Sequence, residues 1–221
     1  DDYTNLIADF RISEGAKAFI GSTMQVSGVT QNDYSEPLTF TILSDDEQLT
    51  SEWTIKVQKL INGIRPKDYN ALVDLYNATN GNNWTNNSGW LVVDDVSSWY
   101  GVTVTDDFVS TINLQQNNLV GTIPSGISEL TNLNDLNLRN NSLIGDIPKS
   151  ISNLKSLINL RLYNNQLSGI IPIEIGFLSN LQELGLSNNK LSGEIPATIG
   201  NIGGLKYIQL GSNELVGSIP L

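Results

Sequence analysis

The chain has no cysteine and no histidine among its 221 residues. The missing cysteines exclude disulfides, thiolate catalysis, iron–sulfur clusters and cysteine-bound zinc. The missing histidines exclude Ser-His and Cys-His catalytic pairs, HExxH metal sites and an imidazole pH switch. Carboxylates, lysine and tyrosine remain as catalytic groups, and we expect no metal or other cofactor.

Positive charge and long apolar runs are also scarce. The 12 Lys and Arg residues stand against 23 Asp and Glu, which gives a formal net charge of -11. Nucleic acid and anionic lipid are bound through basic residues that neutralise phosphate, so we expect no nucleic-acid partner. No apolar run approaches the ~20 residues that span a bilayer, so we expect no membrane insertion. The opening, DDYTNLIADF, has neither an initiator Met nor a signal peptide, and we expect the sequence to be part of a longer protein.

From Val109 onward the sequence repeats every 24 residues. The consensus is L-x-x-L-x-L-x-x-N-x-L-x-G-x-I-P-x-x-I-x-x-L-x-x, and the fifth copy is truncated at Pro220-Leu221. The five copies begin at Val109, Leu133, Leu157, Leu181 and Leu205. Such a period predicts a solenoid, in which stacked copies share one apolar core and form a parallel sheet with strands about 4.8 Å apart.

Each recurring residue type has a predicted role in the coil. The repeat asparagines are expected to bond the backbone groups that the turn leaves unpaired, because an amide both donates and accepts. The repeat glycines are expected to take backbone angles that are unfavourable for other residues. The Ile and Leu pairs three residues apart, such as Ile127 and Leu130, predict short 3₁₀ turns on the convex wall.

The motif LxGxIPxxIxxL resembles the plant-type class of leucine-rich repeats. In plant receptor ectodomains, that class covers its first repeat with a helix, tryptophans and a Cys pair around W-x-G-V-x-C. Here SSWYGVTV matches at Trp99, Gly101 and Val102, but other residues fill both cysteine positions. We therefore expect a cap held by packing. This departure argues against a plant receptor and, together with the segment in front of the cap, favours a bacterial surface protein.

The segment before the repeats has strand-like alternation in TNLIADFRI, PLTFTIL and SEWTIKVQ. It resembles the Ig-like modules of bacterial cell-surface proteins at Asp33-Tyr34, Pro37 to Ile42 and Trp53 to Val57. The predicted fold is therefore mixed β and α/β: a small N-terminal Ig-like β-sandwich followed by a right-handed leucine-rich-repeat solenoid with a parallel concave sheet. The predicted domains are an incomplete Ig-like module at 1–62, a helix and Trp-rich cap at 63–108, and the repeats at 109–221.

The cap is predicted from a helical face and three tryptophans. Asp68 is expected to be the N-cap of a helix that buries Ala71, Leu72, Leu75 and Tyr76. The tryptophans Trp84, Trp90 and Trp99 are expected to form an apolar plug over the first coil, with an aromatic ligand site as the alternative.

The outward positions of the concave sheet differ from copy to copy, whereas the scaffold residues recur. Arg139, Arg161 and Tyr163 stand out on an acidic chain, because an Arg fork beside a Tyr ring suits a carboxylate, a sugar or a peptide backbone. The alternative is that the arginines only form solvated ion pairs with Asp135 or Glu183. The candidate ligand-binding residues are Asp135, Asn137, Arg139, Asn159, Arg161, Tyr163, Glu183 and Tyr207.

These features favour a non-enzymatic, secreted or cell-surface module on a bacterial exterior that binds a protein or glycan through its concave face. A rigid spacer presenting another domain is the alternative. Glycoside hydrolysis is disfavoured because Asp135 and Glu183 lie about 9.6 Å apart on an open face. Binding of ice by the polar row Gln116, Asn140, Asn164, Asn188 and Ser212 stays open.

The last predicted coil has no capping element. Its apolar residues are Leu205, Ile208, Leu210, Leu215 and Ile219. An uncovered solenoid end exposes core, so we expect the native chain to continue or two chains to self-associate there.

Overall fold

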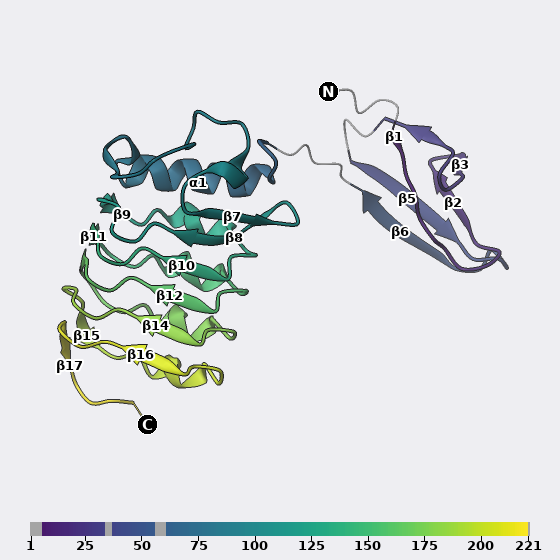
Figure 1. Ribbon diagram of the computed structural model, residues 1–221. Coiled ribbons are helices and arrows are strands. Elements are labelled where there is room, and N and C mark those ends of the chain that lie inside the picture. Colours follow the sequence, from purple (N-terminus) through teal and green to yellow (C-terminus); the bar gives the residue numbers. More distant parts are fainter. Residues whose placement is uncertain (1–5, 34–36, 56–60, 221) are drawn as a thin grey trace. The chain divides into compact units, whose positions relative to one another are not determined.

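The computed structural model describes residues 6–33, 37–55 and 61–220 (Figure 1). The chain divides into two compact units, Asp1–Lys59 and Leu60–Leu221. Within the described ranges no helix has the length and apolarity needed to cross a membrane.

The first unit is antiparallel. Its four-stranded sheet has the order β3-β2-β5-β6, and a separate pair joins β1 to β4. The strands are β1 (Leu6–Ile7), β2 (Lys17–Ile20), β3 (Thr23–Gln25), β4 (Gln31–Asn32), β5 (Leu38–Leu43) and β6 (Thr50–Ile55). Ala18 and Phe40 are buried at its centre, where the Phe10 and Phe40 rings meet edge to face at 5.7 Å. The strands expected in PLTFTIL and SEWTIKVQ are confirmed as β5 and β6, but the described part of TNLIADFRI, from Leu6 onward, forms only the two-residue β1.

The Ig-like identity of this unit stays a prediction. Tyr34 and Val57, which carry part of that resemblance, lie outside the described residues. Trp53 pairs in register with Phe40, and the period-two pattern predicts that it is buried. Its side chain is instead 53% exposed, because among the described strands β6 lies at the edge of the sheet and pairs with β5 alone.

The second unit is the predicted solenoid. Its concave sheet has the order β16-β14-β12-β10-β8-β7, and every neighbouring pair is parallel except β7 with β8. The strands are β7 (Val102–Thr105), β8 (Phe108–Asn113), β10 (Asp135–Asn137), β12 (Asn159–Arg161), β14 (Glu183–Gly185) and β16 (Tyr207–Gln209). The coils stack in register, since Leu136 pairs with Ile112 on one side and with Leu160 on the other.

Short strands and 3₁₀ turns complete each coil. The flank strands are β9 (Val120–Thr122), β11 (Ser142–Gly145), β13 (Gln166–Leu167), β15 (Ser192–Glu194) and β17 (Glu214–Val216). The 3₁₀ turns are η3 (Ser125–Glu129), η4 (Lys149–Asn153), η5 (Ile173–Phe177) and η6 (Ala197–Asn201). Their positions confirm the turns predicted from the Ile and Leu spacing.

The repeat leucines and asparagines act as predicted. Leu136, Leu160 and Leu184 have no solvent exposure. The Asn165 Oδ1 atom accepts the Leu143 N–H at 3.0 Å, and its Nδ2 atom donates to the carbonyls of Leu138 and Leu162 at 3.0 and 2.9 Å. One amide thus serves three backbone groups in neighbouring coils, which ties the stack together.

The cap is built from α1 (Pro66–Ala78), the 3₁₀ turns η1 (Gly81–Asn83) and η2 (Val96–Ser98), and the three tryptophans. The rings of Trp84 and Trp90 lie 4.8 Å apart and those of Trp90 and Trp99 4.9 Å apart. Each indole N–H donates to a backbone carbonyl at 2.9 Å, so the rings are buried without an unpaired donor. The structural plug is confirmed, and the chain contains no disulfide to support it.

The predicted N-cap is wrong by one turn. The helix begins at Pro66 with Arg65 as its N-cap, because proline is favoured in the first turn, where no N–H is required. Asp68 lies inside that turn, has no solvent exposure and accepts the Val109 N–H at 2.9 Å. It therefore links the cap helix to the first repeat strand instead of closing the helix end.

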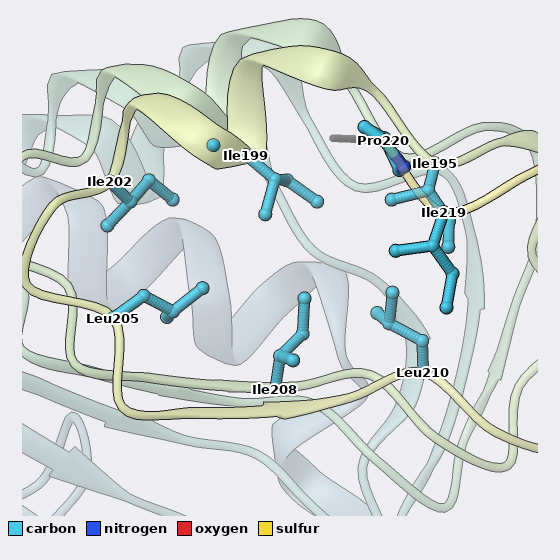
Figure 2. Close-up of a pocket in the computed structure, with 9 residues that line it drawn as sticks. Ile195, Ile199, Ile202, Leu205, Ile208, Leu210, Ile219 and Pro220 are labelled. Carbon is cyan, nitrogen blue, oxygen red and sulfur yellow. The ribbon is translucent and has the colours of Figure 1, made fainter.

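The coil at the other end of the solenoid exposes apolar side chains, as expected. Figure 2 shows Ile199 and Ile202 on one side and Leu205, Ile208 and Leu210 on the other, pointing toward one another across a depression of about 490 Å³. Ile208 is 45% exposed, whereas Leu184 at the same position one coil earlier is fully buried.

Candidate functional site

The concave sheet brings together all eight predicted ligand-binding residues. Asp135, Asn159, Glu183 and Tyr207 form one row across β10, β12, β14 and β16, since each pairs in register with the next. Asn137 and Arg161 belong to a second row that continues to Gly185. Arg139 and Tyr163 follow two residues later on their coils, so the set forms one continuous surface.

Arg161 bridges the two carboxylates of the first row. Its Nε and Nη2 atoms donate to Glu183 Oε2 at 2.9 and 2.6 Å, and its Nη1 atom donates to Asp135 Oδ2 at 2.9 Å. The hydrogen bonds to Glu183 and the charge of Asp135 raise the pKa of Arg161, with burial acting in the opposite direction. The ion-pair interpretation of Arg161 is therefore correct, and its guanidinium is already occupied by protein carboxylates.

Arg139 behaves differently from Arg161. Its Nη1 atom donates to the Tyr163 hydroxyl, and its guanidinium lies 5.4 Å from the centre of that ring. Arg139 forms no ion pair with Asp135 or Glu183 among the described residues. Its buried Nε has no hydrogen-bond partner in the same part of the chain, so this side chain keeps an unused donor.

Small and amide side chains surround these groups. Gly185 is buried beneath Tyr163, because a Cβ atom there would lie 2.9 Å from Tyr163 Cδ1. Asn137 Nδ2 donates to Gln115 Oε1 at 3.4 Å, and Asn159 Nδ2 donates to Asp135 Oδ2 at 3.0 Å. Tyr207 is 67% exposed and free to contact a ligand.

The repeat pattern places Gln115 and Gly185 at outward positions of the concave sheet, but they are not among the predicted ligand-binding residues. A glycine beside a bulky tyrosine is a signal that could have singled out Gly185, whereas Gln115 has no distinguishing signal. The charges of Asp135, Glu183, Arg139 and Arg161 cancel formally, so the face is polar and close to neutral. No group of three or more Asp and Glu side chains that could hold a metal occurs in the described ranges.

Comparison with known proteins identifies the repeat. Residues 131–191 and 108–130 match two models described as leucine rich repeat. The chain is similar to the BIR2 ectodomain from Arabidopsis thaliana, with 31% identity and a TM-score of 0.65 over 69% of this chain and 83% of that one. The chain belongs to the leucine-rich repeat family.

Two further solved structures show the range of the similarity to this leucine-rich repeat protein. A chain of the BIR3–SERK2 complex from Arabidopsis thaliana is 31% identical, with a TM-score of 0.59 over 68% of this chain and 84% of that chain. A plant ice-binding protein is 34% identical, with a TM-score of 0.64 over 69% of this chain and 50% of that chain. The comparison with curated proteins gives no match. The matched family models lie within residues 108–191 and do not cover the first unit of this leucine-rich repeat protein.

Proposed function

We propose that this leucine-rich repeat protein is a non-enzymatic extracellular module that binds a protein or peptide through its concave sheet. The observation that supports this most directly is that Arg161 joins side chains of three successive coils into one network. These side chains lie at positions that differ from coil to coil. Preorganised side chains lose less conformational entropy on binding than free ones. The likeness to a chain of the BIR3–SERK2 complex, an assembly of two plant proteins, supports a protein partner.

The residues divide into two roles in this proposal. Arg161, Asp135, Glu183 and Asn159 position the surface, because their donors and acceptors are used within it. Tyr163, Tyr207 and Arg139 make the ligand contacts, since a Tyr ring offers apolar area with a polar tip and Arg139 has no ion pair with Asp135 or Glu183. Asn137 is only 6% exposed and donates to Gln115, so it supports the surface from beneath. A neutral polar face with tyrosines also suits a glycan, which is the other ligand class to test.

A display experiment with the whole chain tests this proposal. The immobilised protein is panned against a random peptide library and, in parallel, against a glycan array. Binders that use the concave face are expected to lose at least tenfold in affinity on Tyr163→Ala or Tyr207→Ala, while Val92→Ser, an exposed substitution in the cap, leaves them unchanged. Binders that tolerate both tyrosine substitutions would contradict the proposal, and an absence of binders would favour the rigid spacer.

Location and self-association belong to the same proposal. The similar structures named above are plant proteins, which suggests a plant and not a bacterial origin, and we propose an extracellular location on that basis. Self-association through the apolar depression of Figure 2 stays a proposal. Light scattering that gives a monomer mass at high concentration would count against it.

Ice binding is a second candidate that one observation favours. Asn164 Nδ2 donates to Asn140 Oδ1, and Asn188 Nδ2 donates to Asn164 Oδ1 at 2.7 Å, which forms an exposed amide ladder with one residue per coil. The likeness to a plant ice-binding protein adds support. Thermal hysteresis that disappears on Asn164→Leu would establish this activity, and its absence in the unmodified protein would exclude it.

A further inference from the structure

One surface position per coil forms a row on the flank of the solenoid, away from the concave sheet. It is the residue between Gly and Ile in the G-x-I-P motif, and its occupants are Thr122, Asp146, Ile170, Glu194 and Ser218. Each of the first four lies across the repeat glycine of the next coil. A Cβ at Gly145 would meet Thr122 at 3.2 Å, one at Gly193 would meet Ile170 at 3.0 Å, and one at Gly217 would meet Glu194 at 3.2 Å. The row therefore runs without a break along the stacked coils, and the repeat glycines lie between its side chains.

The third coil has a different sequence from the other coils at two positions on this flank. It has Ile170 where the other coils have Thr, Asp, Glu and Ser, and Ile173 where three of them have Ser, Lys and Ala. Both isoleucines are 57% exposed. The first, second and fourth coils fold with polar or small residues at both positions, so the fold of a coil does not require these isoleucines. Exposed apolar side chains that gather on one patch mark interaction surfaces.

The patch is hollowed on both sides of Ile170. A depression of about 440 Å³ is lined by Ile170, Ile173, Glu194, Ile195, Pro196 and Ala197, among others. A second one, of about 180 Å³, shares Ile170 with Asp146, Lys149 and Pro172. An aliphatic side chain from another molecule can enter either depression and contact Ile170.

Two carboxylates flank the isoleucine within the row. Asp146 and Glu194 lie one coil before and one coil after Ile170, about 9.6 Å apart at the spacing of stacked strands. Neither forms an ion pair among the described residues. Lys149 lines the same depression as Asp146 and offsets part of its negative charge. Glu194 is therefore expected to attract a positively charged side chain more strongly than Asp146 does.

From this pattern we propose that the flank, defined by Asp146, Ile170, Ile173 and Glu194, binds a basic aliphatic helix of a partner protein. An aliphatic side chain of the helix packs on Ile170 and Ile173, while Lys or Arg residues on the same helical face reach Asp146 and Glu194. Residues seven apart on one helical face are separated by about 10.5 Å, which matches the separation of the two carboxylates. This surface is distinct from the concave sheet, so it does not depend on the function proposed above.

Designed peptides provide the test. The probe is a fluorescein-labelled 16-residue helix of Ala, Leu and Lys, with a central Leu between two Lys residues seven apart; two twins replace Lys by Glu or Leu by Ser. The Lys–Leu peptide is expected to bind the whole chain, and each twin at least tenfold more weakly. Binding is expected to weaken as salt rises, since charges at a rim are screened.

Variants of the protein locate the binding. Ile170→Thr/Ile173→Ser gives the third coil the residues of the first coil, Thr122 and Ser125, and is expected to reduce affinity at least tenfold. Glu194→Gln is expected to reduce affinity severalfold and flatten the salt dependence, while Val92→Ser and Tyr163→Ala change neither. If the double variant proves unfolded by circular dichroism, Glu194→Gln alone decides.

Three results would overturn this proposal: no binding of the Lys–Leu peptide, equal binding of the Glu twin, or affinity within twofold of wild type for a folded double variant. Hydrogen exchange in the complex adds a positional readout. Protection is expected at residues 146–149, 170–173 and 194–197, and protection confined to the concave strands would also overturn it.

Discussion

Arg161 and Glu183 are joined by two hydrogen bonds to one carboxylate oxygen, from Nε at 2.9 Å and from Nη2 at 2.6 Å. The Nη1 atom of Arg161 donates to Asp135, which lies on the preceding coil. One side chain on β12 therefore connects β10 to β14 across the concave face. The three side chains are 22 to 25% exposed, so solvent screens these bonds only in part.

Removing Arg161 is expected to destabilise the solenoid. Arg161→Ala leaves two carboxylates of one row without their shared cation, and we expect a loss of about 1–3 kcal/mol in the free energy of unfolding. Arg161→Lys is expected to recover only part of this loss, because an ammonium cannot present two forks in a plane. Urea denaturation followed by circular dichroism measures both variants, with Lys190→Ala as the exposed control. Equal stability of Arg161→Ala and wild type would show that the bridge contributes nothing.

The asparagine stack is expected to have a comparable effect. Asn165→Ala leaves the Leu143 N–H without its partner. The carbonyls of Leu138 and Leu162 each lose one amide donor but keep a second, from Asn141 and Asn189. One unsatisfied buried group costs about 1–3 kcal/mol, so we expect a loss of about 1–3 kcal/mol. The exposed neighbour Gln166→Ala is expected to stay within about 0.5 kcal/mol of wild type. Similar unfolding midpoints for the two variants would contradict this role.

The scaffold was predictable because each of its residues recurs. Leucines that return every 24 residues can share one core only by stacking, and the asparagines have one location where both their donor and acceptor are needed. The 3₁₀ turns and the tryptophan plug follow in the same way from spacing and apolar area. Recurrence carries no information about the concave side chains, because these are the positions that do not recur.

What escaped prediction depends on contacts between distant residues. The ion pairs of Arg161 with Asp135 and Glu183 were one of two alternatives that the sequence left open. The hydrogen bond from Arg139 to Tyr163, 24 positions away, was not predicted. Asp68 fits the composition of an N-cap, but a proline two residues earlier already begins the helix. The flank isoleucines were present in the sequence as departures from the consensus, and only their exposure shows that they form a surface.

Two glycines are expected to differ in their tolerance of alanine. Gly121 has a φ of +130°, and a Cβ there would overlap the Ala78 carbonyl at the end of α1. Gly193 has a φ of +73°, and its Cβ would meet only the Ile170 side chain at 3.0 Å. Backbone cannot move aside as a side chain can, so Gly121→Ala is expected to lower the melting temperature more than Gly193→Ala, which carries mainly the roughly 1 kcal/mol penalty of a left-handed residue. The reverse order in differential scanning calorimetry would contradict the close approach of cap and first coil.

Asp68 is expected to make stability depend on pH in an unusual direction. Burial raises the pKa of its carboxyl, and the Val109 N–H and Arg65 oppose that shift without cancelling it. A folded-state pKa above the unfolded one means that the folded protein binds the proton more tightly. The stabilising contribution of this group is therefore complete below its unfolded pKa, about 3.9, and is lost as pH rises through the folded value.

Asp68→Asn removes this titration while keeping an oxygen for the Val109 N–H, and Asp68→Ala removes the acceptor as well. We expect the stability of wild type relative to Asp68→Asn to fall as pH rises from 3 to 7, whereas Asp68→Ala is less stable than Asp68→Asn at every pH, by about 1–3 kcal/mol for the unpaired N–H. Using the difference between variants cancels the titration of the other carboxylates. Denaturation midpoints at several pH values measure both quantities. A wild-type advantage that grows with pH would mean that Arg65 controls the carboxyl and that Asp68 is charged and stabilising in the folded protein.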